Sequence, residues 1–296
     1  MTATILMMGL IPLVVAYQLG EEGKLARDCA LAVHFVFGLL LAGYAAGSAL
    51  TREMRNGTAS SVLSKSVSRE TFFMAKFAGV AAVVALFSFC AMLSTLLSAR
   101  IAPFFYRPDM LAASLTLAGP PLAFLAGGAA NLWRQRPFAT SAVLWLTGFL
   151  IAAFVVVAFL DRQGHVVAFG GAIEWRLAPA SMLITLSLFV LAAVAITLAA
   201  RLSSGPALAG VFVVFSLGLV SEFLFGRAAP HSTLASAASA LLPDWQHFWL
   251  TDALVRGGTI PLDYVLQCGS YAALYTTGVL FIGMALFRHA DIHHLR

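Results

Sequence analysis

The feature that most constrains the fold of this 296-residue chain is a series of eight apolar runs. A helix needs roughly 17–25 mainly apolar residues to cross a bilayer. The runs are continuously apolar and do not alternate, which favours helices over the strands of a membrane barrel. Only 10% of the residues are charged, against about 25% in a soluble domain. We therefore predict an all-α polytopic membrane protein with about eight transmembrane helices, at 3–18, 29–50, 77–98, 110–132, 139–160, 179–200, 207–225 and 267–287.

Two of the runs are irregular. The first is barely long enough to span, and no Lys or Arg precedes Lys24, so it lacks the basic start of a signal peptide and is expected to be a retained helix. The fourth contains Pro120 and Pro121, which predict a kink or break near its middle. Six spans would follow if the pairs around Pro120 or Gly205-Pro206 were re-entrant.

The basic residues predict the orientation. With eight spans both termini share one side with 51–76, 133–138, 201–206 and 288–296, which together carry ten Lys and Arg. The other side, with 18–28, 99–109, 161–178 and 226–266, carries eight in a much longer total length. Because cytoplasmic loops are enriched in Lys and Arg, both termini and the 51–76 loop are expected in the cytoplasm.

The chain reads as one transmembrane domain over 1–296, with no nucleotide-binding domain and no internal repeat. Its longest external segment is 226–266. Within it, 245–256 is predicted to form a short amphipathic helix that begins after Asp244 and ends at Gly257-Gly258. The aromatic residues of this helix suit a membrane interface.

Motifs for catalysis are absent from the sequence. There is no phosphate-binding loop, because GEEGK at 20–24 has the wrong spacing, and there is no G-x-S-x-G or H-E-x-x-H pattern. Cys29, Cys90 and Cys268 lack the spacing of metal or redox sites. The excess of basic residues is a topology signal, so no nucleic acid is expected as a partner. We predict no catalytic residue, no metal and no bound cofactor. If the protein is a pump, its energy must therefore come from another subunit or from an ion gradient.

Few polar residues lie within the spans. His34 is interpreted as an interhelical hydrogen-bonding residue, with a proton relay as the alternative. Glu222, near the end of a span, is interpreted as an interfacial acid close to Arg227, with an ion pathway as the alternative. His289, His293 and His294 are interpreted as part of a solvated tail, with metal ligation by His289 and His293, which stand four residues apart, as the alternative.

The most polar run of the chain lies in the 51–76 loop. Its surroundings, GSALTREMRNGTASSVLSKSVSRETFFMAKFAGV, resemble the permease subunits of type-2 ATP-binding-cassette (ABC) transporters, in particular the branch of multicopper-enzyme-maturation permeases. LLPDWQHFWLTDAL and the last span with its exit F-R-x-x-D also resemble that family. Agreement at the level of motifs covers 47–79 and 241–292. The matching residues of the loop are Glu53, Gly57, Thr58, Val62, Leu63, Lys65, Val67, Ser68, Arg69 and Lys76, and Ser66 stands where the family usually has proline.

The resemblance implies that the loop holds a coupling helix, which docks on a separate ATP-binding subunit. Residues 53–64 are long enough for about three helical turns, and Ser66 or Ser68 is placed to cap the next helix. The alternative is that the basic residues only hold the loop inside and bind anionic lipid. The candidate coupling residues are Glu53, Met54, Arg55, Gly57, Thr58, Val62, Leu63, Lys65 and Arg69.

By the same resemblance the chain is expected to be an exporter subunit in a bacterial inner membrane. Its expected partners are a second permease (identical or paralogous), ATP-binding subunits that hold ATP and magnesium, a periplasmic accessory protein and the lipid bilayer. Gly43, Gly47, Gly127 and Gly128 would allow close helix packing suited to an amphipathic or lipid-linked substrate. Family members commonly begin with a basic amphipathic helix, whereas this chain starts almost inside its first apolar run.

Two other functions stay open from the sequence. One is a polytopic membrane enzyme whose site is formed by Asp244, Asp252 and Asp263. The other is an ion-coupled secondary transporter that uses Glu222 or His34.

Overall fold

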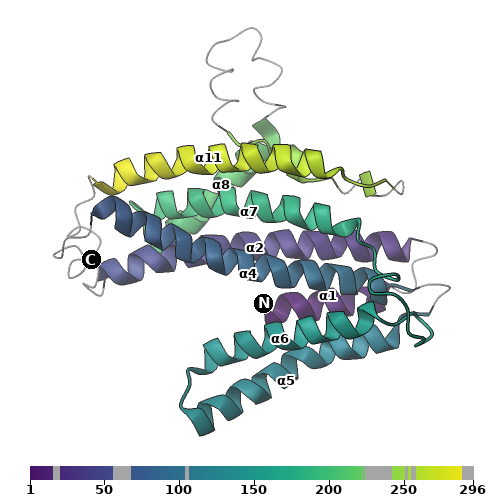
Figure 1. Ribbon diagram of the computed structural model, residues 1–296. Coiled ribbons are helices and arrows are strands. Elements are labelled where there is room, and N and C mark those ends of the chain that lie inside the picture. The colour runs from purple at the N-terminus through teal and green to yellow at the C-terminus, as the bar shows by residue number, and fades with distance from the viewer. Residues whose placement is uncertain are drawn as a thin grey trace. The chain divides into compact units, whose positions relative to one another are not determined.

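The computed structural model describes residues 1–15, 21–55, 68–103, 107–221, 223, 242–250, 253–254 and 258–288, with backbone alone for 51–55. Within these ranges the chain is helical apart from its turns and loops, and an isolated bridge pairs Leu160 with Val166. The helices are α1 (Thr2–Val14), α2 (Glu22–Arg55), α4 (Arg69–Ile101), α5 (Met110–Arg134), α6 (Phe138–Ala158), α7 (Leu177–Ala199), α8 (Ser204–Ser221), the 3-10 helix η4 (Trp245–Phe248) and α11 (Leu262–Arg288) (Figure 1).

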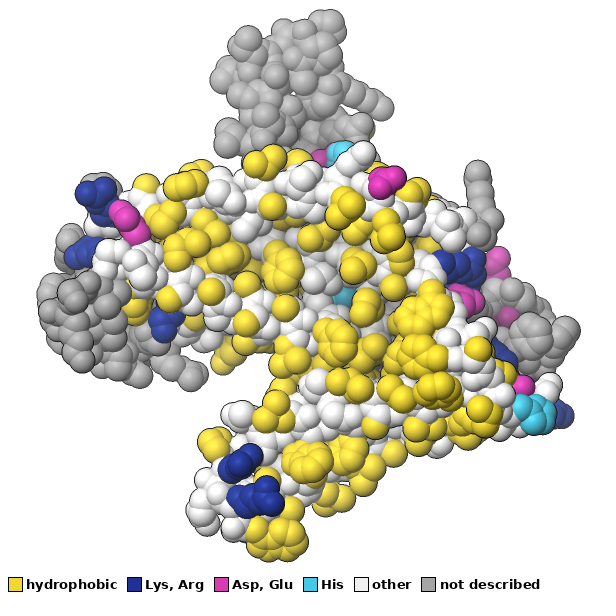
Figure 2. All heavy atoms as spheres, viewed as in Figure 1, with side chains coloured by type: hydrophobic (Ala, Val, Ile, Leu, Met, Phe, Trp, Pro, Cys, Tyr) yellow, Lys and Arg dark blue, Asp and Glu magenta, His cyan; other side chains and the backbone are white. Residues whose placement is uncertain are grey.

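Seven of the described helices are long and apolar enough to cross a membrane. Each of the seven coincides with one predicted run, and large apolar side chains such as Leu125, Leu266 and Leu274 are more than 70% exposed on their outer faces. Figure 2 shows hydrophobic side chains over most of the visible helical surface. These observations confirm an all-α polytopic membrane protein.

The predicted first span is shorter than expected. Helix α1 has 13 residues, a length of about 20 Å against the roughly 30 Å of a bilayer core. The rest of the predicted run, residues 16–18, lies outside the described residues.

The two irregular proline sites do not interrupt helices. Pro120 and Pro121 lie inside α5, which continues for 25 residues, so of the predicted kink or break the break is wrong. Pro206 is the third residue of α8, where a proline is tolerated because first-turn N–H groups have no helical acceptor. Both helices are candidate spans, which does not favour the six-span alternative.

Close contacts divide the chain into two units, and α2, α4 and α7 each contribute residues to both. The first unit comprises Met1–Phe37, Leu86–Met182 and Thr251–Ile260. In it α5 and α6 form a hairpin, and α1 packs on α5 (Figure 1). A Cβ on Gly127 of α5 would lie 3.0 Å from the backbone of Ala142 on α6, so this glycine permits the close approach that the sequence suggested.

The second unit comprises Gly38–Ala85, Leu183–Leu250 and Pro261–Arg296. Here Gly43 faces Leu208, and a Cβ on Gly47 would lie 3.1 Å from the Cα atom of Ser204 at the start of α8. The prediction of close packing is therefore confirmed for Gly43, Gly47 and Gly127. It is wrong for Gly128, which has open space beside it.

The predicted amphipathic helix over 245–256 is not continuous: Trp245–Phe248 form the 3-10 turn η4, Trp249 and Leu250 are not helical, Ala253 and Leu254 are helical, and 251–252 and 255–256 lie outside the described residues. In a longer α-helix the carbonyl of His247 would accept from the backbone N–H four residues later. It instead accepts from Tyr264 Oη at 3.0 Å and from Cys268 Sγ at 3.5 Å, both on α11. Trp245 and Phe248 are 3% exposed, so these two aromatic residues pack inside the protein and anchor the turn.

Candidate coupling surface

The polar loop begins on a membrane helix. Helix α2 continues without interruption through Arg55, so the backbone of Glu53, Met54 and Arg55 forms its last turn. Its 34 residues correspond to about 50 Å, which exceeds the roughly 30 Å bilayer core. The expected separate helix therefore does not begin at residue 53, because these residues extend α2. The remaining loop candidates, Gly57, Thr58, Val62, Leu63 and Lys65, lie outside the described residues.

The loop ends at a capped helix start. The backbone N–H of Thr71 donates to Ser68 Oγ at 3.1 Å, and the two hydroxyl oxygens lie 2.8 Å apart. This confirms Ser68 as the cap of α4. Glu70 lies in the first turn, where a negative charge is favoured by the helix dipole. The cap fixes where α4 begins and places Arg69 at its first position.

The start of α4 and the end of α11 form one contact, the α4–α11 junction, made by Arg69, Glu70, Phe72, Phe73, Gly283, Phe287 and Arg288. Arg69 Nη1 donates to the backbone oxygen of Arg288 at 2.9 Å. This bond satisfies one of the carbonyls that a helix end leaves without a partner. The Arg288 and Glu70 side chains approach to 4.0 Å and are 71% and 55% exposed, so their ion pair contributes little by itself.

The interior of the α4–α11 junction is aromatic. Phe287 is 2% exposed. Its ring stacks on Phe72 with centroids 6.0 Å apart and lies 5.8 Å from the ring of Phe73. A Cβ on Gly283 would lie 2.6 Å from Phe73 Cζ, so the absence of a side chain lets this ring approach α11. Lys76 Nζ lies 5.2 Å from the centre of the Phe72 ring, within the range of a cation–π contact.

The α4–α11 junction joins the two stretches that carry the family resemblance. Residues 47–79 include the start of α4, and residues 241–292 include the end of α11. Figure 2 shows basic and acidic side chains gathered where α11 ends and α4 begins. The junction therefore has a buried aromatic interior and an exposed charged rim, and it lies where the polar loop meets α4.

A second charged cluster lies in the first unit, and the sequence reading missed its central pair. Arg100 Nη2 and a carboxylate oxygen of Asp109 are 3.1 Å apart, with side chains 3% and 5% exposed. Asp109 also caps α5 by accepting from the backbone N–H of Ala112 at 3.0 Å. Arg100 donates to the backbone oxygen of Leu160 at 3.1 Å. The sequence signal is a basic residue at one span end and an acid at the next span start, which is too common to be diagnostic.

Neighbouring charges extend this cluster. Arg162 donates to the backbone oxygen of Ala102 at 2.9 Å, and Arg27 lies 3.0 Å from Glu174. Burial, followed by the nearby positive charge of Arg100, lowers the pKa of Arg162. The segments 18–28, 99–109 and 161–178, all predicted to lie outside the membrane on the same side, thus meet within one unit. Ion pairs and backbone hydrogen bonds already occupy this cluster, which gives it a structural role.

Of the two candidate polar residues of the spans, the structure describes His34. His34 is fully buried, and its ring lies edge-on to Phe87 with centroids 6.0 Å apart. Among the described residues neither ring nitrogen has a hydrogen-bond partner, so the expected interhelical hydrogen bond is not formed there. Glu222 lies outside the described residues.

The alternative carboxylate site is not assembled in the part of the chain that the structure describes. Asp244 accepts from the backbone N–H of Gln246 at 2.9 Å and lies 2.9 Å from His247 Nδ1. Asp263 lies separately in the first turn of α11, and Asp252 is outside the described residues. No cluster of three or more His, Cys, Asp or Glu that could hold a metal occurs among the residues described. The histidines after Arg288 are beyond them.

Comparison of the chain with protein-family models, with curated proteins and with solved structures found no match.

Proposed function

We propose that this chain is the membrane-spanning permease subunit of a type-2 ABC transporter, an exporter of a bacterial inner membrane. ATP and magnesium are bound and used by a separate subunit, and a second permease, identical or paralogous, completes the pathway. A periplasmic accessory protein is a further expected partner. In this proposal α1 crosses the membrane as an eighth span, so that both termini and the 51–76 loop lie in the cytoplasm.

The observation that carries this proposal is the α4–α11 junction. The two stretches that resemble the family are far apart in the sequence, yet Arg69 and Arg288 bond directly and Phe72 stacks on Phe287. A docking loop can transmit force only if its ends are attached to spans. The loop starts on the extended end of α2, and it ends on α4 at the point where α4 packs against α11. A partner that pulls on the loop would therefore act on three spans.

The distribution of acids favours this class over an ion-coupled transporter. Among the described residues every Asp and Glu lies in a loop or within about two turns of a helix end. Coupling to protons or sodium generally uses ionisable groups near the middle of the membrane. The absence of a phosphate-binding loop from the sequence is consistent with a separate energy-supplying subunit.

Charge reversal tests the coupling role. Arg55→Glu and Arg69→Glu are expected to reduce ATPase activity of the assembled transporter by about tenfold or more, because each replaces an attractive contact by a repulsive one. Lys24→Glu is the matched control, since Lys24 lies at the other predicted face and pairs weakly with Glu21 at 3.5 Å. ATPase activity unchanged by both arginine variants would rule out the loop as the coupling element.

A further inference from the structure

The α5–α6 hairpin carries two arginines at its closed end. Gln135, which follows α5, adopts a left-handed conformation with φ 52° and ends the helix. The side-chain amide of Asn131 donates to the backbone oxygen of Arg136 at 2.8 Å, and Pro137 precedes the first residue of α6. The connection is therefore a short, internally bonded turn, and it holds Arg134 and Arg136 one residue apart on either side of Gln135.

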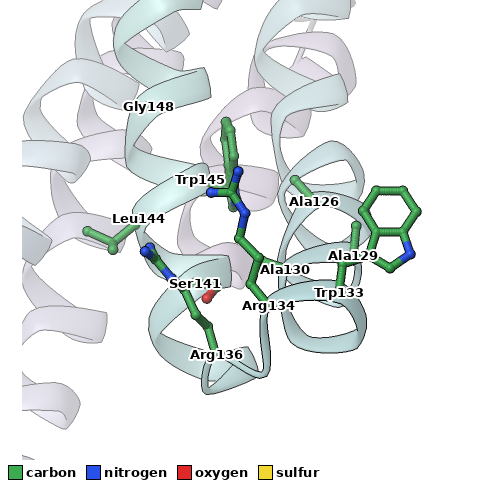
Figure 3. A pocket seen from close by; sticks show the side chains of 10 residues that line it. All are labelled: Ala126, Ala129, Ala130, Trp133, Arg134, Arg136, Ser141, Leu144, Trp145 and Gly148. Carbon is green, nitrogen blue, oxygen red and sulfur yellow. The ribbon is translucent and has the colours of Figure 1, made fainter.

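A groove runs along the hairpin from this turn. Its volume is about 670 Å³, within the range of about 300–1,000 Å³ that is usual for small-molecule sites. The groove is lined by small residues and by aromatic, basic and hydroxyl side chains (Figure 3). The lining residues are Ala126, Ala129, Ala130, Trp133, Arg134, Arg136, Ser141, Leu144, Trp145 and Gly148.

The groove has positive charge at one end and apolar walls beyond it. Figure 3 shows the side chains of Arg134 and Arg136 extending from the turn along the groove, toward Trp145 and Ser141. The sequence contains no acidic residue between Asp109 and Asp161. Among the described residues no ion pair involves either arginine, and Figure 2 shows basic side chains at this end of the hairpin. The two charges are thus available to an anion.

The depth of the groove in the membrane indicates what the anion is attached to. Both α5 and α6 are candidate spans, so the turn that joins them lies at a membrane–water interface. Trp133, which is 86% exposed beside Arg134, is a residue type enriched at that level. The phosphate groups of phospholipids lie at the same level, and their acyl chains extend toward the bilayer centre. A groove that is basic at the interface and apolar below it matches this arrangement.

We propose that the α5–α6 groove is a binding site for one anionic phospholipid. Arg134 and Arg136 bind the phosphate and the negative headgroup, with guanidinium N–H groups donating to phosphate oxygens. One acyl chain lies along Ala126, Leu144 and Gly148. Arginines at a membrane interface can simply extend into headgroup water. This pair differs because both arginines line one groove, and among the described residues neither forms an ion pair with an acid. The inference stands independently of the transport proposal, because it concerns the isolated chain.

The test is native mass spectrometry of the purified full-length chain in detergent with dioleoyl phosphatidylglycerol. Dioleoyl phosphatidylcholine has the same acyl chains and phosphate but no net charge, and it is expected to bind about tenfold more weakly. The double variant R134Q/R136Q is expected to remove this preference. Arg201→Gln is the charge control, since Arg201 is exposed and does not line the groove, and it should retain the preference.

A second variant tests the groove without changing its charge. No atom lies within 4 Å of a Cβ built on Gly148 or on Gly128, and only Gly148 lines the groove. Gly148→Leu should fill it and lower phosphatidylglycerol binding by about tenfold, whereas Gly128→Leu should leave binding unchanged. Equal binding of the two lipids, or unchanged binding in both R134Q/R136Q and Gly148→Leu, would overturn the proposal. Displacement of the lipid by inorganic phosphate at equal concentration would also overturn it, because the site would then bind a free anion.

Discussion

Arg69 donates a 2.9 Å hydrogen bond to the backbone oxygen of Arg288, so the first residue of α4 is attached to the last residue of α11. The bond lies at the rim of a buried aromatic contact between Phe287 and the rings of Phe72 and Phe73. Arg69, with which α4 begins, is therefore part of the packing between α4 and α11. A force applied to the loop would reach α11 through this contact.

Truncation of Phe287 should destabilise the protein. Phe287→Ala removes a ring that is 2% exposed, and the expected loss is about 3 kcal/mol because a cavity remains between α4 and α11. Phe281→Ala is the control on the same helix, since Phe281 is 65% exposed and should change stability by less than about 1 kcal/mol. Thermal unfolding in detergent, followed by tryptophan fluorescence, measures the difference. Equal melting temperatures for the two variants would contradict a packed α4–α11 junction.

The two glycines at positions 47 and 79 should respond to alanine in opposite directions. A Cβ on Gly47 would lie 3.1 Å from the Cα atom of Ser204, so Gly47→Ala must separate α2 from α8 and should lower stability by about 1–2 kcal/mol. Gly79 lies inside α4 with open space around it, so Gly79→Ala should raise stability by about 0.5–1 kcal/mol. Melting temperatures of the two variants give the answer. A rise for Gly47→Ala would show that α2 and α8 are not closely packed there.

The buried pair of Arg100 and Asp109 should be costly to break. Arg100→Gln leaves the Asp109 carboxylate, 5% exposed, without its cation, and such losses cost about 3–5 kcal/mol. Lys24→Gln removes one member of an exposed pair with side chains 41% and 63% accessible, for which a change below about 1 kcal/mol is expected. Chemical unfolding in detergent compares the two. A loss in Arg100→Gln no larger than in Lys24→Gln would mean that the pair is solvated.

Stability should fall in acid partly because of Asp161. The backbone N–H of His165 donates to Asp161 Oδ1 at 2.8 Å, and this bond is the main reason that the Asp161 pKa lies below its ordinary value of 3.8. Since the folded pKa is the lower one, the stabilisation is present above pH 3.8 and is lost as the pH falls through the folded value.

The melting temperature of wild type should therefore drop more between pH 6 and pH 3 than that of Asp161→Asn. His165→Ala should keep most of the drop, because the backbone donor remains and only the smaller contribution of the His165 ring, 3.2 Å from Asp161 Oδ2, is lost. If wild type and Asp161→Asn fell equally, the carboxylate would not be stabilised in the folded state.

The fold class was predictable because membrane spans depend on local composition. Every predicted run is helical over most of its described residues, with turns or a bridge only at the ends, at Phe159, Leu160 and Ala200, since apolar residues in a bilayer must satisfy their backbone hydrogen bonds internally. Helix ends were less predictable. Helix α2 continues to Arg55, past the last apolar residue of its run, because polar residues such as Glu and Arg also favour helix. The prediction of a continuous helix over 245–256 is wrong at Trp249 and Leu250, where the preceding carbonyl of His247 accepts from Tyr264 and Cys268, residues that are distant in sequence.

Of the candidate site, the sequence predicted only the features that depend on residues close together in the chain. Ser68 as a helix cap followed from residue type and position. The bond from Arg69 to Arg288 and the enclosure of Phe287 depend on the packing of distant helices, which single-helix patterns do not report. The groove beside Arg134 and Arg136 was missed for a similar reason, because it requires the small residues of α5 and α6 to face the same side.

Isolation of the tagged chain from its native membrane is the most direct test of the central claim. In a mild detergent, the permease proposal predicts co-purification of a subunit with a phosphate-binding loop, in a stoichiometric amount and with magnesium-dependent ATPase activity. Mass spectrometry of the isolated complex identifies such a subunit, and Arg55→Glu should reduce its recovery. Isolation of the chain, with chemical cross-linking before solubilisation, free of any ATP-binding subunit would contradict the account.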